Sequence, residues 1–355
     1  MREVAVVSFA QSKSVRADPV QNEVEILMPV IQEVVANSGI PSKEIGFTCS
    51  GSADYLAGQP FAFVYGLEAI GAWPPVRESH VEADGAWALY EAWVLMQEGE
   101  IDSALIYGFS KSSPGSLRDV LTRQLDPYYL APLWPDAISL AALQARLLLE
   151  SGSITERDMA EVAARSRRDG KGNPNAQLTG DFDLDQILAE PYIASPLRRS
   201  DCAPISDGAA AVVLAAGDLA RKVSERPAWI RGIDHRVEPH YPGVRDLTTS
   251  PSTRKAAEVA GALDGAFDVA EIYAPFTHQE LILRDALGLA NPNGTKINPS
   301  GGALAANPMM AAGLIRIGEA ASRIARGEAN RALAHATSGP CLQQNLVAVL
   351  EGEPS

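Results

Sequence analysis

Cysteines are scarce in this sequence: Cys49, Cys202 and Cys341 are the three among 355 residues. They lie far apart, form no C-x-x-C pair and are odd in number, which excludes a disulfide framework and a zinc finger. Basic residues are also few, because 30 Lys+Arg stand against 44 Asp+Glu, for a formal charge of −14. Nucleic-acid binders usually carry a basic face, so no nucleic-acid partner is expected.

Long apolar runs are missing as well. No stretch approaches the ~18 apolar residues that a membrane-spanning helix needs, and the longest candidate, 208–217 (GAAAVVLAAG), has the length of a strand. The first residues, MREVAVVSFAQSK, turn polar too early for a signal peptide. We therefore expect a cytoplasmic protein with no membrane span.

The sequence also lacks the common motifs of nucleotide-binding sites and of metal sites. The fingerprints G-x-G-x-x-G and G-x-x-x-x-G-K-[ST] do not occur, which removes the simplest nucleotide-binding hypotheses. No set of three acidic or histidine residues has the spacing of metal ligands, so no metal site is expected.

Strands and helices alternate along the chain, and hydrophobic residues make up 46% of it, enough for a large core. Residues 3–9 (EVAVVSF) predict a strand, and 21–38 carry apolar residues at helical spacing before Gly39, a typical helix end. A second helix is expected over 85–98, followed by a buried strand over 103–107. Apolar strands separated by helices are typical of a largely parallel sheet in an α/β fold.

One step of the chain occurs twice. Residues 97–108 read QEGEIDSALIYG and residues 325–336 read ARGEANRALAHA, a helix end, Gly-Glu and the start of a strand in both cases. We expect a duplicated α/β unit with an N-terminal half at 1–225 and a C-terminal half at 226–355. An insertion at about 112–196, with Pro, Gly and Asn in its loops, interrupts the first half. It is either a loop region over a substrate site or a surface insertion without a catalytic role.

Four segments carry a resemblance to a known family. They are 80–108, 204–215 (PISDGAAAVVLA), 268–289 (DVAEIYAPFTHQELILRDALGL) and 296–313 (KINPSGGALAANPMMAAG). In this order they resemble the thiolase superfamily, specifically its sterol-carrier-protein type and the related lipid-transfer proteins, over essentially the whole chain.

The resemblance implies two βαβαβ halves stacked as five layers, α-β-α-β-α, usually in a dimer. It also implies an acyl-CoA substrate that enters between the halves, with coenzyme A as part of the substrate and no covalently bound cofactor. The residues implied to contact coenzyme A are Ser300, Gly301 and Gly302, from the segment that is similar to the family's N-P-S-G-G loop.

The reactive groups of a thiolase are replaced in this sequence. The position of the nucleophilic cysteine falls on Glu82, the histidine of G-H-P falls on Asn307, and the histidine of H-D-x-F falls on Tyr273. The C-terminal glycine-rich loop reads SGPCLQQN, with Cys341 a couple of residues away from the family's second cysteine. Claisen chemistry through an acyl-cysteine is therefore not expected.

The replacements can still move protons. A carboxylate at Glu82, at the start of a helix, is stabilised as an anion by the helix dipole or kept protonated by an apolar pocket. The phenol of Tyr273 can give or take a proton, and the amide of Asn307 can donate to a thioester oxygen. The alternative for Glu82 and Asn307 is that each caps a helix. Two histidines are further candidates: His278 near a helix start, and His335 at the end of a strand.

Three functions remain open. The first is retro-aldol cleavage of a β-hydroxyacyl-CoA, which needs a base and an oxyanion site but no nucleophile. Steroid side-chain aldolases, among the relatives that the chain resembles, also lack the thiolase cysteine and work with an OB-fold/zinc-ribbon partner. The second is a non-catalytic subunit paired with an active thiolase-like or OB-fold protein. The third is a thiolase that uses Cys341.

Overall fold

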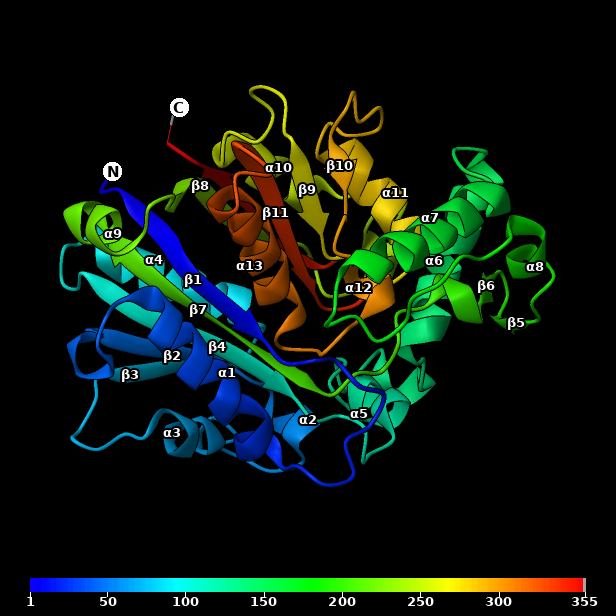
Figure 1. Cartoon of the computed structure of the whole chain (residues 1–355). Helices are drawn as coiled ribbons and strands as arrows, with labels where there is room; N and C mark the ends of the chain where they lie inside the picture. Colours follow the sequence, from blue (N-terminus) through cyan, green and yellow to red (C-terminus); the bar gives the residue numbers. More distant parts are fainter. Residues whose placement is uncertain (354–355) are drawn as a thin grey trace.

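The computed structural model describes residues 1–353 and contains a ten-stranded sheet in the order β10-β9-β11-β12-β8-β1-β7-β4-β2-β3 (Figure 1). The N-terminal half supplies β1 (Val4–Gln11), β2 (Phe47–Gly51), β3 (Glu78–Val81), β4 (Ser103–Ser110) and β7 (Gly208–Ala216). The C-terminal half supplies β8 (Ala228–Val237), β9 (Val269–Ile272), β10 (Lys296–Ile297), β11 (Arg331–Ser338) and β12 (Gln344–Glu351).

The two halves have the same topology. In each half the strands, counted along the chain, lie in the order third, second, fourth, fifth, first. The second strand is parallel to its two neighbours and the fifth is antiparallel to both of its own. The halves join where Ala5 and Val6 of β1 pair with β8. Identical strand order agrees with the duplication expected from the repeated step, while a division at 225/226 stays a prediction.

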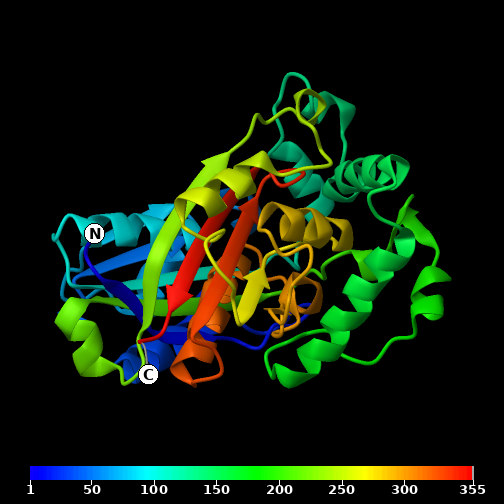
Figure 2. The same cartoon turned by 90° about the horizontal axis from the view of Figure 1, so that it is seen from above.

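The two halves of the sheet form two layers, with the C-terminal strands (yellow to red) nearer to the viewer in Figure 2, and helices form three further layers. Helices α4 (Gly85–Gln97) and α13 (Ala312–Ala325) share one apolar core with strands of both halves, so they form the central layer. On the outer face of the N-terminal half lie α1 (Glu23–Ser38) and α3 (Val64–Ile70). On the outer face of the C-terminal half lie α10 (Pro251–Val259) and α11 (Thr277–Ala286). The expected α-β-α-β-α arrangement is confirmed.

The region at about 112–196 is largely helical. It contains α5 (Leu117–Arg123), α6 (Ala137–Ser151), α7 (Glu156–Asp169) and α8 (Leu184–Leu188), followed by a small ribbon of β5 (Tyr192–Ala194) and β6 (Leu197–Arg198). These elements lie together beside the sheet in Figure 1. A buried ion pair fixes α7 to α11, with Arg165 Nη2 2.7 Å from Glu280 Oε1.

Local signals explain where the helices start and stop. Helix α1 begins after a capping box of Asn22 and Glu25 and ends at Gly39, whose φ of 69° is left-handed. Helix α13 begins at Ala312, two residues after Met310, whose φ of 62° is not helical. The remaining short helices are α2 (Asp54–Ala57), α9 (Gly217–Val223) and α12 (Gly302–Ala305).

Across residues 1–353, none of the helices combines the length and the apolar character required to cross a membrane.

Candidate functional site

The N-terminal ends of the two central helices meet at one carboxylate. Asp84 accepts hydrogen bonds from the main-chain N–H of Ala86 at 2.8 Å, of Gly313 at 2.8 Å and of Leu314 at 3.0 Å. Its side chain is buried, with 1% of the residue exposed. Burial raises the pKa of Asp84, and the three N–H donors oppose that shift. This junction lies at the carboxyl end of β2, because a Cβ on Gly51, the last residue of that strand, would lie 2.4 Å from the main-chain nitrogen of Gly85. Open α/β sheets usually bind ligands at the carboxyl ends of their strands.

Two glycines allow this close packing. A Cβ on Gly313 would lie 2.6 Å from Asp84 Oδ1, so any side chain there would displace the carboxylate. A Cβ on Gly108, in β4, would lie 2.2 Å from the carbonyl oxygen of Met310, which accepts a hydrogen bond from the N–H of Gly85 at 2.8 Å. The loop before α13 is therefore fixed against the start of α4.

Tyr273 lies beside this junction. It follows β9 directly, is 5% exposed, and packs against Ala303 and Ala312. Burial, and next the negative charge of Asp84, raise the pKa of Tyr273, while Arg316 opposes the shift. Within residues 1–353 its hydroxyl has no hydrogen-bond partner in the protein. The side chain is therefore a neutral phenol with a free donor and acceptor.

Glu82 is exposed and lies two residues before Asp84 in the chain. It follows β3, and its Oε1 accepts a hydrogen bond from the N–H of Asp54 at 2.7 Å, at the start of α2. Partial burial raises the pKa of Glu82, and the Asp54 N–H opposes the shift. The expectation that Glu82 stands at the start of α4 is wrong, because the N-cap of α4 is Asp84.

Asn307 precedes α13 without capping it. The helix begins five residues later, and the N–H of Asn307 donates to Ser206 Oγ at 3.0 Å. Its side-chain Oδ1 is buried and has no partner among residues 1–353. Tyr273 packs against Ala303 of α12, and Asn307 follows the end of that helix by two residues, so both are candidates for one ligand.

The two candidate histidines are buried elsewhere. His278 of α11 lies with its Nε2 3.2 Å from Gln144 Oε1 of α6, and burial lowers its pKa to about 3. His335 of β11 lies with its Nε2 3.0 Å from Asn345 Oδ1, and burial lowers its pKa to about 4. Neither contacts the Asp84 junction, and both are neutral at physiological pH.

The residues expected to contact coenzyme A are engaged within the protein. Ser300 is buried, donates to Glu271 Oε2 at 2.7 Å and accepts from Arg316 Nη1 at 2.7 Å. A Cβ on Gly301 would lie 2.8 Å from Gly170 Cα, and one on Gly302 would lie 3.0 Å from the Asn298 side chain. This loop supports the fold around Glu271 and Arg316, and a contact with coenzyme A at these residues stays a prediction.

None of the cysteines has the surroundings of a nucleophile. Cys341 packs in an apolar cluster with Leu125, Leu140 and Leu247, and burial raises its pKa to about 11. Burial raises the pKa of Cys49 and of Cys202 to about 12. Thiolates are the reactive form of cysteine, so these environments disfavour an acyl-cysteine.

Asp84 is the residue that sequence reasoning missed. An aspartate directly before Gly85 and an apolar run is a recognisable N-cap signal. Its second role, capping α13 from the other half of the chain, depends on tertiary packing and has no signal in the sequence.

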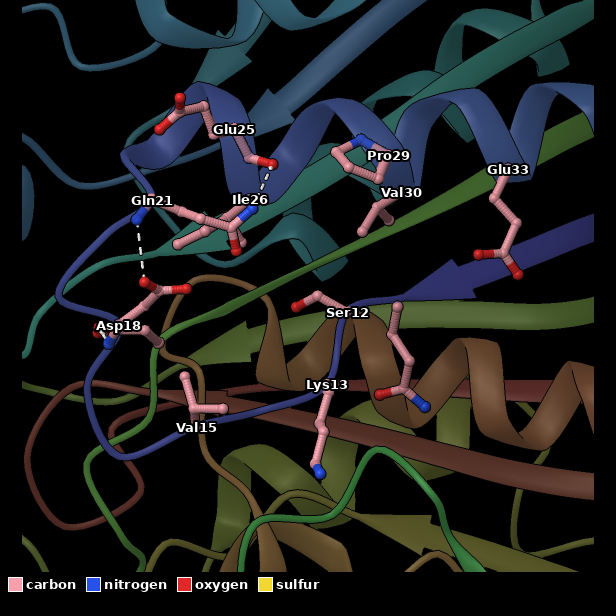
Figure 3. A pocket seen from close by; sticks show the side chains of 12 residues that line it. Ser12, Lys13, Val15, Asp18, Gln21, Glu25, Ile26, Pro29, Val30 and Glu33 are labelled. Atoms are coloured by element: carbon pink, nitrogen blue, oxygen red, sulfur yellow. Dashed lines mark hydrogen bonds between the residues drawn. The ribbon is translucent and has the colours of Figure 1, made fainter.

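A separate pocket of about 320 Å³ lies along α1 and the end of β1 (Figure 3). Ser12, Lys13 and Asp18 line it on one side, and Pro29 and Glu33 of α1 line the other. None of the predicted site residues lines it. A smaller pocket of about 10 Å³ lies next to Met310, between α2 and the end of β4.

The architecture is that of the thiolase fold. A solved structure described as the Ltp2-ChsH2(DUF35) aldolase superposes with a TM-score of 0.83 at 18% identity, over 99% of this chain and 98% of that one. The human mitochondrial 3-ketoacyl-CoA thiolase superposes with a TM-score of 0.78 at 15% identity, over 99% of both chains.

Sequence comparison gives a matching result. Sterol carrier protein 2 of Gallus gallus is 28% identical over 385 aligned residues, which cover 94% of this chain and 69% of that protein. No family model matches the chain. The expected resemblance to thiolase-fold proteins, including sterol carrier protein 2, is confirmed.

Proposed function

We propose that this protein cleaves a β-hydroxyacyl-CoA thioester by a retro-aldol reaction. The observation that carries the proposal is the neutral phenol of Tyr273 beside the junction of α4 and α13. Thioester substrates are supported by the relatives, since one solved neighbour is named a 3-ketoacyl-CoA thiolase and another an aldolase. The buried, high-pKa thiols favour the aldolase over the acyltransferase.

The reaction requires one base and one site for negative charge. The base removes the proton of the β-hydroxyl group, the Cα–Cβ bond breaks, and a ketone or aldehyde leaves. The bonding electrons form the enolate of the shortened thioester, which is then protonated at carbon to give the product CoA ester. No step needs a nucleophile on the protein.

The proposed roles follow the protonation states. Tyr273, kept protonated by burial, donates a hydrogen bond to the developing enolate and then gives its proton to the enolate carbon. Glu82 is the proposed group that accepts the hydroxyl proton, because its side chain is exposed and its pKa is raised. The proton that Glu82 took from the hydroxyl group returns to Tyr273, which restores both groups. Asn307 donates its amide to the thioester oxygen.

A partner protein is part of the proposal. The solved aldolase neighbour names a DUF35 component beside its thiolase-like one. We propose that this chain, cytoplasmic and dimeric, likewise pairs with an OB-fold/zinc-ribbon protein of the DUF35 type. Substrates of lipid or steroid side-chain type fit the sterol carrier protein relatives.

One observation favours a second candidate, a non-catalytic subunit. The positions of the thiolase cysteine and of its two histidines are occupied by Glu82, Asn307 and Tyr273. A subunit that only supports an active partner would not need the replaced reactive groups.

The test is direct. The purified chain, alone and mixed with a DUF35 partner, is incubated with a branched β-hydroxyacyl-CoA, and products are separated by mass. The proposal expects equal amounts of a ketone and of the shortened CoA ester. Cleavage in the mixture that persists after Glu82→Ala and Tyr273→Phe would assign the chemistry to the partner.

A further inference from the structure

Helix α13 has no cap of its own. The residue before it is Ala311, and the first helical residue is Ala312, so neither side chain can accept a hydrogen bond from the exposed N–H groups. The acceptor comes from Asp84, which also caps α4. One carboxylate therefore serves two helix ends from the two halves of the chain.

A shared helix end of this kind attracts negative charge. The first N–H groups of a helix have no partner within it, and the aligned peptide dipoles place about half a positive charge at that end. Two helices, of 13 and 14 residues, direct these ends at the same point. Such a point is suited to a thiolate, an oxyanion or a carboxylate.

We propose that Asp84 is a resident anion, a positioning residue whose carboxylate permanently fills the shared end of α4 and α13 and excludes the substrate's negative charge from it. This inference rests on the function proposed above. The enolate charge of the reaction is then received by Tyr273 and Asn307, because the N–H groups of Ala86, Gly313 and Leu314 are occupied.

The packing around Asp84 supports permanent occupancy. The residue is 1% exposed, and the missing Cβ of Gly313 gives its carboxylate the space it fills. The charged groups that face the junction are Asp84 itself and Arg316 of α13, whose guanidinium is paired with Glu271 at 2.8 Å. Since Arg316 already has a carboxylate partner, the main-chain N–H groups are the principal neutralising contacts of Asp84.

The first experiment removes the carboxylate and supplies it from solution. Asp84→Ala is expected to melt at a lower temperature than the wild type, and formate is expected to raise that melting temperature by about 2 °C or more. Chloride at the same ionic strength is expected to have no comparable effect. The matched control is Asp183→Ala, which removes the N-cap of α8 with its contacts to the N–H groups of Asp185 and Gln186, at an exposed helix end. Formate is expected to leave the control unchanged.

A second measurement separates the charge of the anion from simple filling of space. Formamide has nearly the size of formate but carries no charge, so it is expected to leave the melting temperature of Asp84→Ala unchanged. If Asp84→Ala does not fold, the formate measurement is made on Asp84→Ser, which keeps one acceptor.

The outcomes are distinguishable from those of the proposed function. Stabilisation by formate but not by formamide supports the resident anion, even in a protein that cleaves no thioester. Absence of stabilisation by formate, or equal stabilisation by formamide, overturns it, even in a protein that is an active aldolase.

Discussion

The main-chain N–H of Tyr273 donates to the carbonyl oxygen of His335 at 3.2 Å, yet the two side chains lie on opposite faces of the C-terminal half-sheet. The phenol packs against Ala312 of α13, in the central layer. The imidazole bonds Asn345, which donates to Ser252 of α10 at 2.8 Å, in the outer layer. Tyr273 therefore belongs to the candidate site, whereas His335, its main-chain neighbour, belongs to the outer core.

Because His335 is buried in this way, we expect it to make the free energy of unfolding depend on pH. Its pKa is lowered from 6.5 to about 4 in the folded protein, so the unfolded chain binds more protons between these values. Stability from this group is complete above about pH 6.5 and is lost as the pH falls toward 4. In His335→Gln, the fall in the free energy of unfolding over that window is expected to be smaller by about 3 kcal/mol.

Urea denaturation at a series of pH values measures the effect. His80→Gln, at an exposed histidine of β3, is measured alongside as the control for the loss of one imidazole. An identical slope in His335→Gln and in the wild type would show that the buried imidazole is not the group that titrates.

The thiols are expected to be inert in the folded protein. With pKa values of about 11 to 12, the thiolate fraction near neutral pH is far below that of a free cysteine. Reaction with a disulfide reagent is expected to be at least about 100-fold slower than for the same thiols in urea. One fast thiol that acyl-CoA protects would instead revive the thiolase alternative at Cys341.

Glu82 is expected to act as the base. Because its pKa is raised above its usual value and only the carboxylate accepts a proton, the cleavage rate is expected to rise with pH through that pKa. Glu82→Gln is expected to lower kcat about 100-fold and to remove this acidic limb.

Glu78→Gln is the matched control for that experiment. Glu78 lies on the same strand, β3, and burial raises its pKa in the same way, but it precedes the end of the strand. Its replacement is expected to leave the rate and the pH profile intact. Equal losses in both variants would point to damage at the edge of the sheet.

Much of the fold could be predicted because its signals are local. The spacing of apolar residues and the glycine that follows them predict the helix before Gly39. The continuous apolar run at 103–107 predicts the strand there. The duplication was visible because the repeated step includes Gly99 and Gly327, which end two central-layer helices with φ values of 77° and 74°. The start of α13 at Ala312 had no such signal, because the left-handed conformation of Met310 depends on tertiary packing.

The site was predicted less completely, for a physical reason. Alignment identified Tyr273 as a replaced reactive group, and the structure places it beside the helix junction. It could not show that His278 packs against α6, or that Asp84 rather than Glu82 receives the helix N–H groups. Both features are contacts between segments that lie far apart in the chain, and such contacts cannot be read from a single sequence.

The most direct measurement is the rate at which Tyr273→Phe cleaves a branched β-hydroxyacyl-CoA, with the DUF35 partner present. Phenylalanine keeps the ring against Ala303 and Ala312, so the melting temperature is expected to stay close to that of the wild type. Loss of the hydroxyl is expected to lower the formation of ketone and shortened CoA ester by about 10²- to 10⁴-fold. Undiminished cleavage by a folded Tyr273→Phe variant would contradict the proposal that this phenol carries the reaction.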